Sequence, residues 1–239
     1  MRFKAVAFDV DGTLYPPAAL NAVAIPTVLR HPLVFAAYGE SRRAIRVLAL
    51  EESYLGSPPA DAAAFRRIQA ELTASLLGGG KRSGRIKGIP AAPRIARIEA
   101  LVDEIVYGNI PELFARIRPF AGLGTALDRL AAAGLRLAAL SDLPPRRKLE
   151  LLGLGERFET ALCSEDSGFL KPSPEPFRLL RETLGLEASD ILYVGNSPAY
   201  DLAGAKAAGM AAAILSRKPV PGADLAFVDW NRLADFALS

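Results

Sequence analysis

The stretch FKAVAFDVDGTLY, residues 3–15, decides the fold of this 239-residue chain. From Ala5 to Phe8 the run is apolar on both parities, which predicts a strand buried on both faces, as in the middle of a parallel sheet. The strand ends at two carboxylates one residue apart, Asp9 and Asp11, followed by a glycine. Helices on both faces of a sheet leave the carboxyl ends of its strands free for chemistry, and Asp9 lies at such an end. An Asp-Gly pair by itself is equally typical of a tight turn. Whether it belongs to a functional site therefore depends on the residues at the ends of the other strands.

Composition limits the class of protein. Hydrophobic residues make up 51% and charged residues 23%, which is typical of a globular protein long enough for one large α/β domain or a domain with an insertion. The single cysteine, Cys163, excludes an intramolecular disulfide and fits a reducing cytoplasm. We find no signal peptide and no apolar run of the roughly 18 residues that a membrane span needs, so we expect a cytoplasmic protein without membrane contacts. A net charge of +3 favours anionic ligands only weakly and does not indicate nucleic acid.

Residues 17–117 contain no segment with the pattern of a strand. Helical periodicity covers residues 18–25, 40–55, 60–77 and 96–107. We expect Pro26 to end the first of these helices. In the second helix we expect one apolar face with three arginines off it; the apolar residues are Ala44, Val47 and Leu48, and the arginines are Arg42, Arg43 and Arg46. The region is therefore predicted to be a helical insertion.

Within the insertion, residues 78–88 read GGGKRSGRIKG. A phosphate-binding Walker loop needs Gly, four residues and then Gly-Lys-Ser/Thr after a strand, whereas this segment follows a predicted helix with a different spacing. We interpret it as a mobile basic loop. The alternative is a lid whose basic side chains meet an anionic substrate, namely Lys81, Arg82, Arg85 or Lys87.

After Pro119 the pattern changes to alternating helices and strands. Strands are predicted at 135–140, 160–163, 191–194 and 211–215. Helices are predicted at 124–133, at 145–152, before residue 184 and at 201–208. Such alternation implies right-handed crossovers and a doubly wound parallel sheet, and we expect Phe227 and Trp230 to join its core from a last strand and helix.

Several of the predicted strand ends carry groups that suit a phosphoryl group and a divalent cation. These groups are Asp9 and Asp11 after the first strand, Ser141 after the second, Lys171 in a loop before a helix, and Asn196 and Asp201 after the fourth. The carboxyl ends of parallel strands lie at one edge of a sheet, so we expect these side chains to converge. The Asp-Gly turn then becomes part of how the site is built.

These motifs resemble, in the same order, the four motifs of the haloacid dehalogenase (HAD) superfamily. DVDGTL at 9–14 is similar to motif one, Ser141 to motif two, Lys171 within LKPSPEPF to motif three, and YVGNSPAYD at 193–201 to motif four. The resemblance implies a Rossmann-like α/β core, here residues 1–16 and 118–239. It also implies a helical cap inserted between motifs one and two, here residues 17–117.

The resemblance implies a hydrolase of small phosphomonoesters. Asp9 would be the nucleophile that forms an aspartyl-phosphate, and Asp11 the general acid and base. Ser141 and Lys171 would hold the phosphoryl oxygens. A Mg²⁺ ion is implied as well, since it prefers oxygen ligands and offsets the repulsion between a carboxylate and a phosphate. Its expected ligands are Asp9, the backbone carbonyl of Asp11, Asn196 and Asp201.

Two residues separate the possible activities. Dehalogenases of this superfamily lack the second aspartate, so Asp11 favours phosphate-ester hydrolysis. Asn196 is the departure, because most phosphatases of the family carry an aspartate there and an amide brings no charge to the metal. The alternatives are therefore a 2-haloacid dehalogenase-like hydrolase or a non-catalytic protein that binds a phosphate ligand. A phosphomutase is also possible, without a cap motif to support it.

The remaining polar residues carry weaker signals. His31 is interpreted as structural rather than as a substrate contact, and Tyr15 and Tyr200 either line the site or pack ordinarily. The run at 146–148, Arg-Arg-Lys, is interpreted as a solvated helix face rather than an anion clamp. We expect a small phosphorylated metabolite as partner, while the sequence defines neither which one nor the oligomeric state.

Overall fold

The computed structural model describes residues 2–51, 54, 56–78 and 91–239, and its sheet is parallel throughout. The strands are β1 (Ala5–Phe8), β2 (Arg136–Ser141), β3 (Thr160–Cys163), β4 (Ile191–Gly195), β5 (Ala211–Leu215) and β6 (Leu225–Phe227). Their order in the sheet is β3-β2-β1-β4-β5-β6, so the first strand of the chain lies in the middle. Phe8 at its end pairs with Ala139 on one side and Val194 on the other. The predicted α/β class and doubly wound sheet are confirmed.

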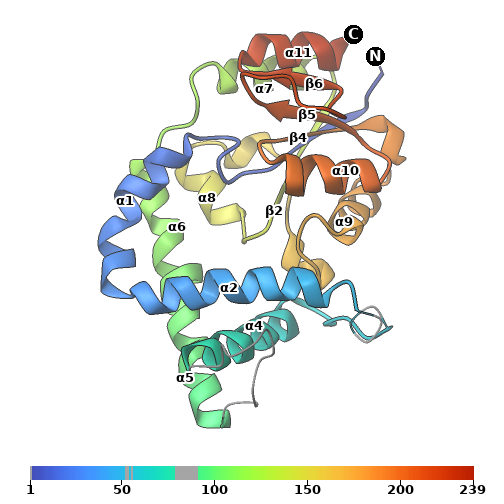
Figure 1. Ribbon diagram of the computed structural model, residues 1–239. Helices are drawn as coiled ribbons and strands as arrows, with labels where there is room; N and C mark the ends of the chain where they lie inside the picture. Colours follow the sequence, from blue (N-terminus) through green and yellow to red (C-terminus); the bar gives the residue numbers. More distant parts are fainter. Residues whose placement is uncertain (1, 52–53, 55, 79–90) are drawn as a thin grey trace.

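Helices cover both faces of the sheet, as Figure 1 shows. Val6 and Phe8 belong to a core shared with α7 (Leu123–Ala132) and α11 (Trp230–Leu238), whereas Ala5 and Ala7 pack with α9 (Pro174–Leu184) and α10 (Ala203–Ala207). Consecutive residues of a strand point to opposite faces, so an apolar run of both parities is what a two-sided core requires. Trp230 and Phe227 are buried, as predicted.

Between residues 17 and 116 the described secondary-structure elements are all helices, joined by short turns. The α-helices of this segment are α1 (Pro17–Arg30), α2 (Pro32–Leu48), α4 (Ala62–Leu77), α5 (Ala92–Val102) and α6 (Ile110–Glu112). Figure 1 shows α2, α4 and α5 gathered apart from the sheet. We call this helical part the cap; its boundaries at residues 17 and 117 stay a prediction. Most of the glycine-rich segment, from residue 79 on, lies outside the described residues.

Two expectations for the cap are wrong. Pro26 does not end the first helix, which continues to Arg30. A proline removes one backbone bond, and here Pro26 and the residue four before it are exposed, so the freed carbonyl can bond water. The second helix begins at Pro32 instead of residue 40 and ends at residue 48 instead of 55. Its buried face is also different: Arg42 is buried, while Val47 is 63% exposed.

No single described helix is long and apolar enough to cross a membrane. α1 and α2 pass that test of length and composition only as a pair bent by 113°.

The packing of α10 against α9 generates a stability prediction. A Cβ added to Gly204 would overlap the ring of Phe177, which is fully buried and packs on Tyr193 with 4.8 Å between ring centroids. Gly204→Ala should therefore lower the free energy of unfolding by about 1–3 kcal/mol. At Gly39 in α2 an added Cβ has no neighbour within 4 Å, so Gly39→Ala should raise the free energy of unfolding by about 0.5–1 kcal/mol. Denaturant titration of both variants checks this, and equal stability of the two would contradict it.

Candidate active site

A buried lysine lies at the centre of the site, at the carboxyl ends of β1 and β4. Lys171 Nζ donates to Asp9 Oδ1 at 2.7 Å, to Asp201 Oδ1 at 2.7 Å and to the hydroxyl of Tyr193 at 3.1 Å. Asp9 follows β1 directly, and its N–H donates to the carbonyl of Val194 at 2.8 Å. The structure thus brings together three of the residues predicted for the site, Asp9, Lys171 and Asp201, from three separate segments.

Burial sets the electrostatics of this centre. Burial raises the pKa of Asp9 to about 7; the charge of Lys171 opposes the rise, and the charges of Asp201 and Asp11 add to it. For Lys171, burial alone would lower the pKa, but the two carboxylates raise it well above its usual value. The lysine therefore stays charged, and its charge offsets only one of the two buried carboxylates that it contacts.

Asp201 holds the loop after β4 as well as the lysine. Its Oδ2 accepts the backbone N–H groups of Asn196 at 3.1 Å and Ser197 at 2.9 Å. This approach requires Gly195, because a Cβ there would overlap the Asp201 side chain. Both carboxylate oxygens of Asp201 therefore accept N–H donors, and its predicted role as a metal ligand stays a prediction.

Asp11 is held by three donors at the edge of the same centre. The hydroxyl of Tyr15 donates to Oδ1 at 2.8 Å, while Ser141 Oγ at 3.0 Å and Lys148 Nζ at 2.5 Å donate to Oδ2. Burial alone would raise the pKa of Asp11, but the charge of Lys148 and these hydrogen bonds hold it below its usual value.

Lys148 corrects an interpretation made from the sequence. The run at 146–148 was expected to be a solvated helix face, and Arg147 is indeed half exposed. Lys148, however, is only 3% exposed. It lies in α8 (Arg146–Leu151), and a six-residue helix places its members on different faces, so neighbours of the same charge type need not share an environment. In a run of three basic residues, the sequence alone does not show which of them is buried.

The oxygen donors of the site fit a hard cation such as Mg²⁺. Among the described residues, no three His, Cys, Asp or Glu side chains form a cluster that could hold a metal ion, so main-chain and amide oxygens are needed. The side-chain Nδ2 of Asn196 donates to the backbone carbonyl of Asp11 at 3.4 Å, and the N–H of Asp9 donates to the carbonyl of Val194 in the neighbouring strand. Gly12 permits this approach, because a Cβ there would overlap Asn196. Carboxylate, carbonyl and amide oxygens are the ligands that Mg²⁺ prefers, and the uncompensated buried carboxylate favours a cation.

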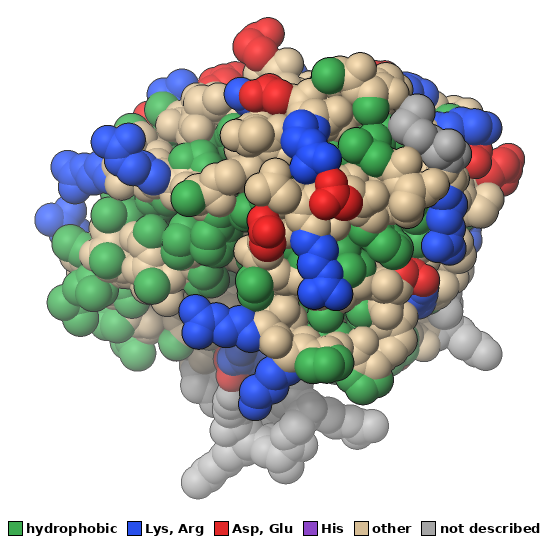
Figure 2. Space-filling model, turned by 90° about the horizontal axis from the view of Figure 1, so that it is seen from above, with side chains coloured by type: hydrophobic (Ala, Val, Ile, Leu, Met, Phe, Trp, Pro, Cys, Tyr) green, Lys and Arg blue, Asp and Glu red, His purple; other side chains and the backbone are tan. Residues whose placement is uncertain are grey.

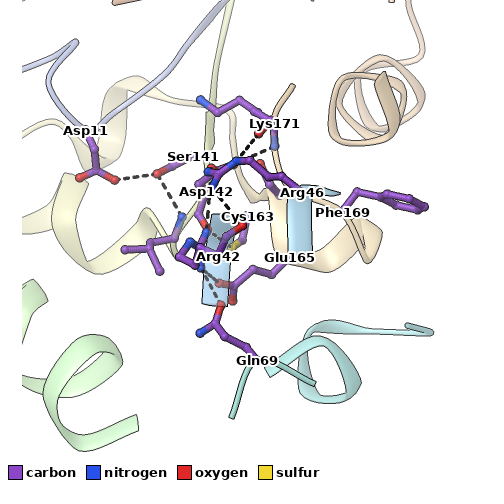
Figure 3. Close-up of polar contacts among 12 residues, drawn as sticks. Asp11, Arg42, Arg46, Gln69, Ser141, Asp142, Cys163, Glu165, Phe169 and Lys171 are labelled. Carbon is purple, nitrogen blue, oxygen red and sulfur yellow. Dashed lines mark hydrogen bonds and ion pairs between the residues drawn. The ribbon is translucent and has the colours of Figure 1, made fainter. Parts of the chain in front are cut away.

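Two arginines of the cap reach the motif residues of the core (Figure 3). Arg46 donates to the backbone carbonyl of Lys171 at 2.7 Å and to Asp142 Oδ2 at 2.6 Å, while Asp142 Oδ1 accepts the backbone N–H of Lys171 at 3.1 Å. Arg42 donates to the carbonyl of Asp142 at 2.6 Å and to Glu165 Oε1 at 2.7 Å. The cap is thus bonded to the residue after Ser141 and to the backbone of Lys171.

Sequence reasoning missed this connection. Arg42 and Arg46 were expected only to lie off the apolar face of their helix, and Glu165 and Asp142 received no role. One signal was present: Arg42 and Arg46 are four residues apart and so share a helix face, and acids follow the ends of β2 and β3.

The chain is similar to known proteins over nearly its whole length. A family model described as haloacid dehalogenase-like hydrolase matches residues 3–209. The phosphoglycolate phosphatase of Rhodospirillum rubrum is 30% identical over 244 residues, which cover 98% of this chain and 90% of that protein. Two solved structures share the fold. A HAD phosphatase from Thermococcus onnurineus has 24% identity and a TM-score of 0.62, over 98% of this chain and 97% of its own. The L-2-haloacid dehalogenase of Xanthobacter autotrophicus has 22% identity and a TM-score of 0.57, over 92% of this chain and 80% of its own.

The buried ion pair between cap and core generates a prediction. Glu165 is fully buried and accepts from Arg42, and also from Arg66 and Tyr107. Glu165→Gln keeps the shape but removes the nearer charge partner of the buried Arg42, which retains only Asp142 Oδ2 at 4.0 Å, so the free energy of unfolding should fall by about 3–5 kcal/mol.

The matched control is Glu112→Gln, which removes the partner of Arg147 from an exposed pair. Exposed pairs contribute little, so this variant should unfold with nearly the parent stability. Thermal and denaturant unfolding measure both, and parent-like stability of Glu165→Gln would show that the ion pair does not hold the cap.

Proposed function

The chain belongs to the haloacid dehalogenase-like hydrolases, and we propose that it is a Mg²⁺-dependent phosphatase of small phosphomonoesters. The observation that carries the proposal is the position of Asp9. It lies 5% exposed at the carboxyl end of the central strand, bonded to Lys171. The 30% identity to a phosphoglycolate phosphatase over nearly the whole chain supports the same reaction class.

In the first step, Asp9 attacks phosphorus as the bond between phosphorus and the ester oxygen breaks. Asp11 gives a proton to the departing oxygen, so the alcohol leaves neutral and Asp9 carries the phosphoryl group. Lys171 and the hydroxyl of Ser141 hold the phosphoryl oxygens as their charge develops. Thr13 donates to Asp9 Oδ2 at 2.7 Å, which leaves the carboxylate fixed at both oxygens before the reaction.

In the second step, a water molecule attacks the phosphorus of the aspartyl-phosphate. Asp11 takes the proton of the water, the bond between phosphorus and the Asp9 oxygen breaks, and inorganic phosphate leaves. The pKa of Asp11, held below its usual value, favours the ionised form that this step requires. The first step needs the protonated form of Asp11 instead, and the proton that Asp11 takes from the water in the second step restores that form for the next cycle.

A Mg²⁺ ion would be held by Asp9, the carbonyl of Asp11 and the side-chain oxygen of Asn196. When bound, it would supply positive charge that reduces the repulsion between the attacking carboxylate and the phosphate. Asp201 is the remaining acid near this position, and we propose that it contributes its charge while holding Lys171.

We propose a small phosphorylated metabolite as the substrate and the cytoplasm as the location. Figure 2 shows basic and acidic side chains interspersed on the visible face, which supports the expectation that nucleic acid is not the partner. The one cysteine of the chain, Cys163, is buried and free, which agrees with a reducing compartment.

A 2-haloacid dehalogenase is the second candidate, and Asn196 is the observation that favours it. Displacement of a halide needs neither a proton for the leaving group nor a metal, whereas the structure holds Asp11 in place with three donors. Chloride release from a 2-haloacid in the presence of a chelator would support this candidate over the phosphatase.

Substitution of the nucleophile tests the proposed chemistry. Asp9→Asn should reduce hydrolysis of 4-nitrophenyl phosphate below detection, because an amide cannot form the phosphorylated intermediate. Lys171 keeps Asp201 as its charge partner, so the variant should fold. Asp190→Asn, which alters an acid paired with the exposed Lys4, is the control and should keep full activity. Full activity of Asp9→Asn would reject the nucleophile.

Metal removal tests the proposed cofactor. EDTA should abolish hydrolysis, and added Mg²⁺ should restore it. Asn196→Asp brings a carboxylate to the carbonyl of Asp11, so it should lower the melting temperature without metal and give a larger rise with Mg²⁺. It should also lower the Mg²⁺ concentration needed for half-maximal activity. Undiminished hydrolysis in EDTA would contradict the metal requirement.

A further inference from the structure

We propose that Lys148 is a positioning residue for Asp11, which it holds at the edge of the phosphoryl site. This inference rests on the proposed function, in which Asp11 serves the leaving oxygen and the attacking water. It is carried by the geometry around a single carboxyl group and by the burial of the lysine.

The contacts of Asp11 are divided between its two oxygens. Tyr15 donates to Oδ1 at 2.8 Å, whereas Lys148 at 2.5 Å and Ser141 at 3.0 Å meet at Oδ2. Lys148 Nζ is also 3.5 Å from Ser141 Oγ, so the ammonium, the hydroxyl and the carboxylate form one compact group. Because Ser141 is proposed to hold a phosphoryl oxygen, Oδ2 of Asp11 is fixed beside the reacting phosphate.

The lysine is itself held in this position. Its side chain is 3% exposed, and its Nζ lies 5.7 Å from the centroid of the fully buried Phe114 ring. That ring packs edge-on against Tyr15 at 5.1 Å, and Tyr15 is the second donor to Asp11. Within the described part of the chain, Asp11 is the one carboxylate within ion-pair distance of Lys148. A buried ammonium with a single acidic partner fixes the orientation of that partner.

Positioning matters here because Asp11 is the less enclosed of the two aspartates. Its side chain is 34% exposed, against 7% for Asp9. Without Lys148, two neutral hydroxyl donors would remain, and the carboxyl group could turn toward solvent. General acid and base catalysis depends on hydrogen-bond contact with the proton that moves, so a turned carboxyl group would lose most of its contribution.

The test compares two substrates that differ in their need for an acid. An alkyl phosphate has a poor leaving group and needs the proton from Asp11, whereas 4-nitrophenyl phosphate leaves as a stable phenolate. In Lys148→Met, kcat/KM for the alkyl ester should fall about 100-fold, and kcat/KM for the aryl ester should change less than about threefold. Tyr15→Phe should also lower kcat/KM for the alkyl ester relative to the aryl ester, but by a smaller factor than Lys148→Met.

Two further variants separate positioning from a general loss of structure. Lys148→Arg keeps the charge beside Asp11 and should restore most of the alkyl activity. Arg147→Met changes the exposed neighbour and should leave both substrates unaffected. Thermal unfolding of Lys148→Met verifies that the variant is folded under the assay conditions.

The outcomes are distinct. An equal loss for both esters, or no loss for either, would overturn the role of Lys148 while the phosphatase activity of the unchanged protein stands. Failure of the unchanged protein to hydrolyse either ester with Mg²⁺ would overturn the proposed function, and the role of Lys148 with it. A selective loss with the alkyl ester, rescued by arginine, supports the inference.

Discussion

The structure depends on one buried ammonium group. Lys171 joins Asp9 from the end of β1 to Asp201 from the helical turn Pro198–Leu202 after β4, with 2.7 Å to each. An unpaired buried carboxylate costs several kcal/mol, so the shared ammonium stabilises both acids in their positions. The lysine is in turn fixed by Tyr193, whose hydroxyl donates to the carbonyl of Leu140 at 3.1 Å. The central strand, its two neighbours and the loop before α9 therefore share one electrostatic constraint.

The cap is tied to the same constraint through the backbone. Arg46 bonds the carbonyl of Lys171, and Asp142 bonds both Arg46 and the N–H of Lys171. A movement of α2 relative to the sheet would therefore break bonds to the segment that carries the central lysine. Position of the cap and geometry of the reaction centre are coupled by direct contacts at this point. These direct contacts are enough to connect the cap with the reaction centre, without a chain of intermediate residues.

The predictable part of the molecule follows from burial of regular elements. β1 and β4 are short apolar runs, and a run with no alternation has few structures other than a strand covered on both faces. The residues at the strand ends could be predicted because a parallel sheet brings them to one edge. The burial of Arg42 and Lys148 could not be predicted, because arguments from periodicity assign charged residues to solvent. What places them inside is an acid from a distant segment, and pairing across more than a hundred residues leaves no local pattern in the sequence.

The charges around the site explain why an amide at Asn196 is compatible with a cation. Three aspartates, at positions 9, 11 and 201, face two lysines, at 148 and 171, so the group carries one net negative charge. Lys148 neutralises Asp11, the acid that we propose transfers protons, and Lys171 neutralises one of the other two. The remaining negative charge lies among the carboxylate, carbonyl and amide oxygens that suit Mg²⁺. We therefore propose that the amide at 196 weakens the affinity for Mg²⁺ without abolishing it, and that it leaves the proposed nucleophile, Asp9, unchanged.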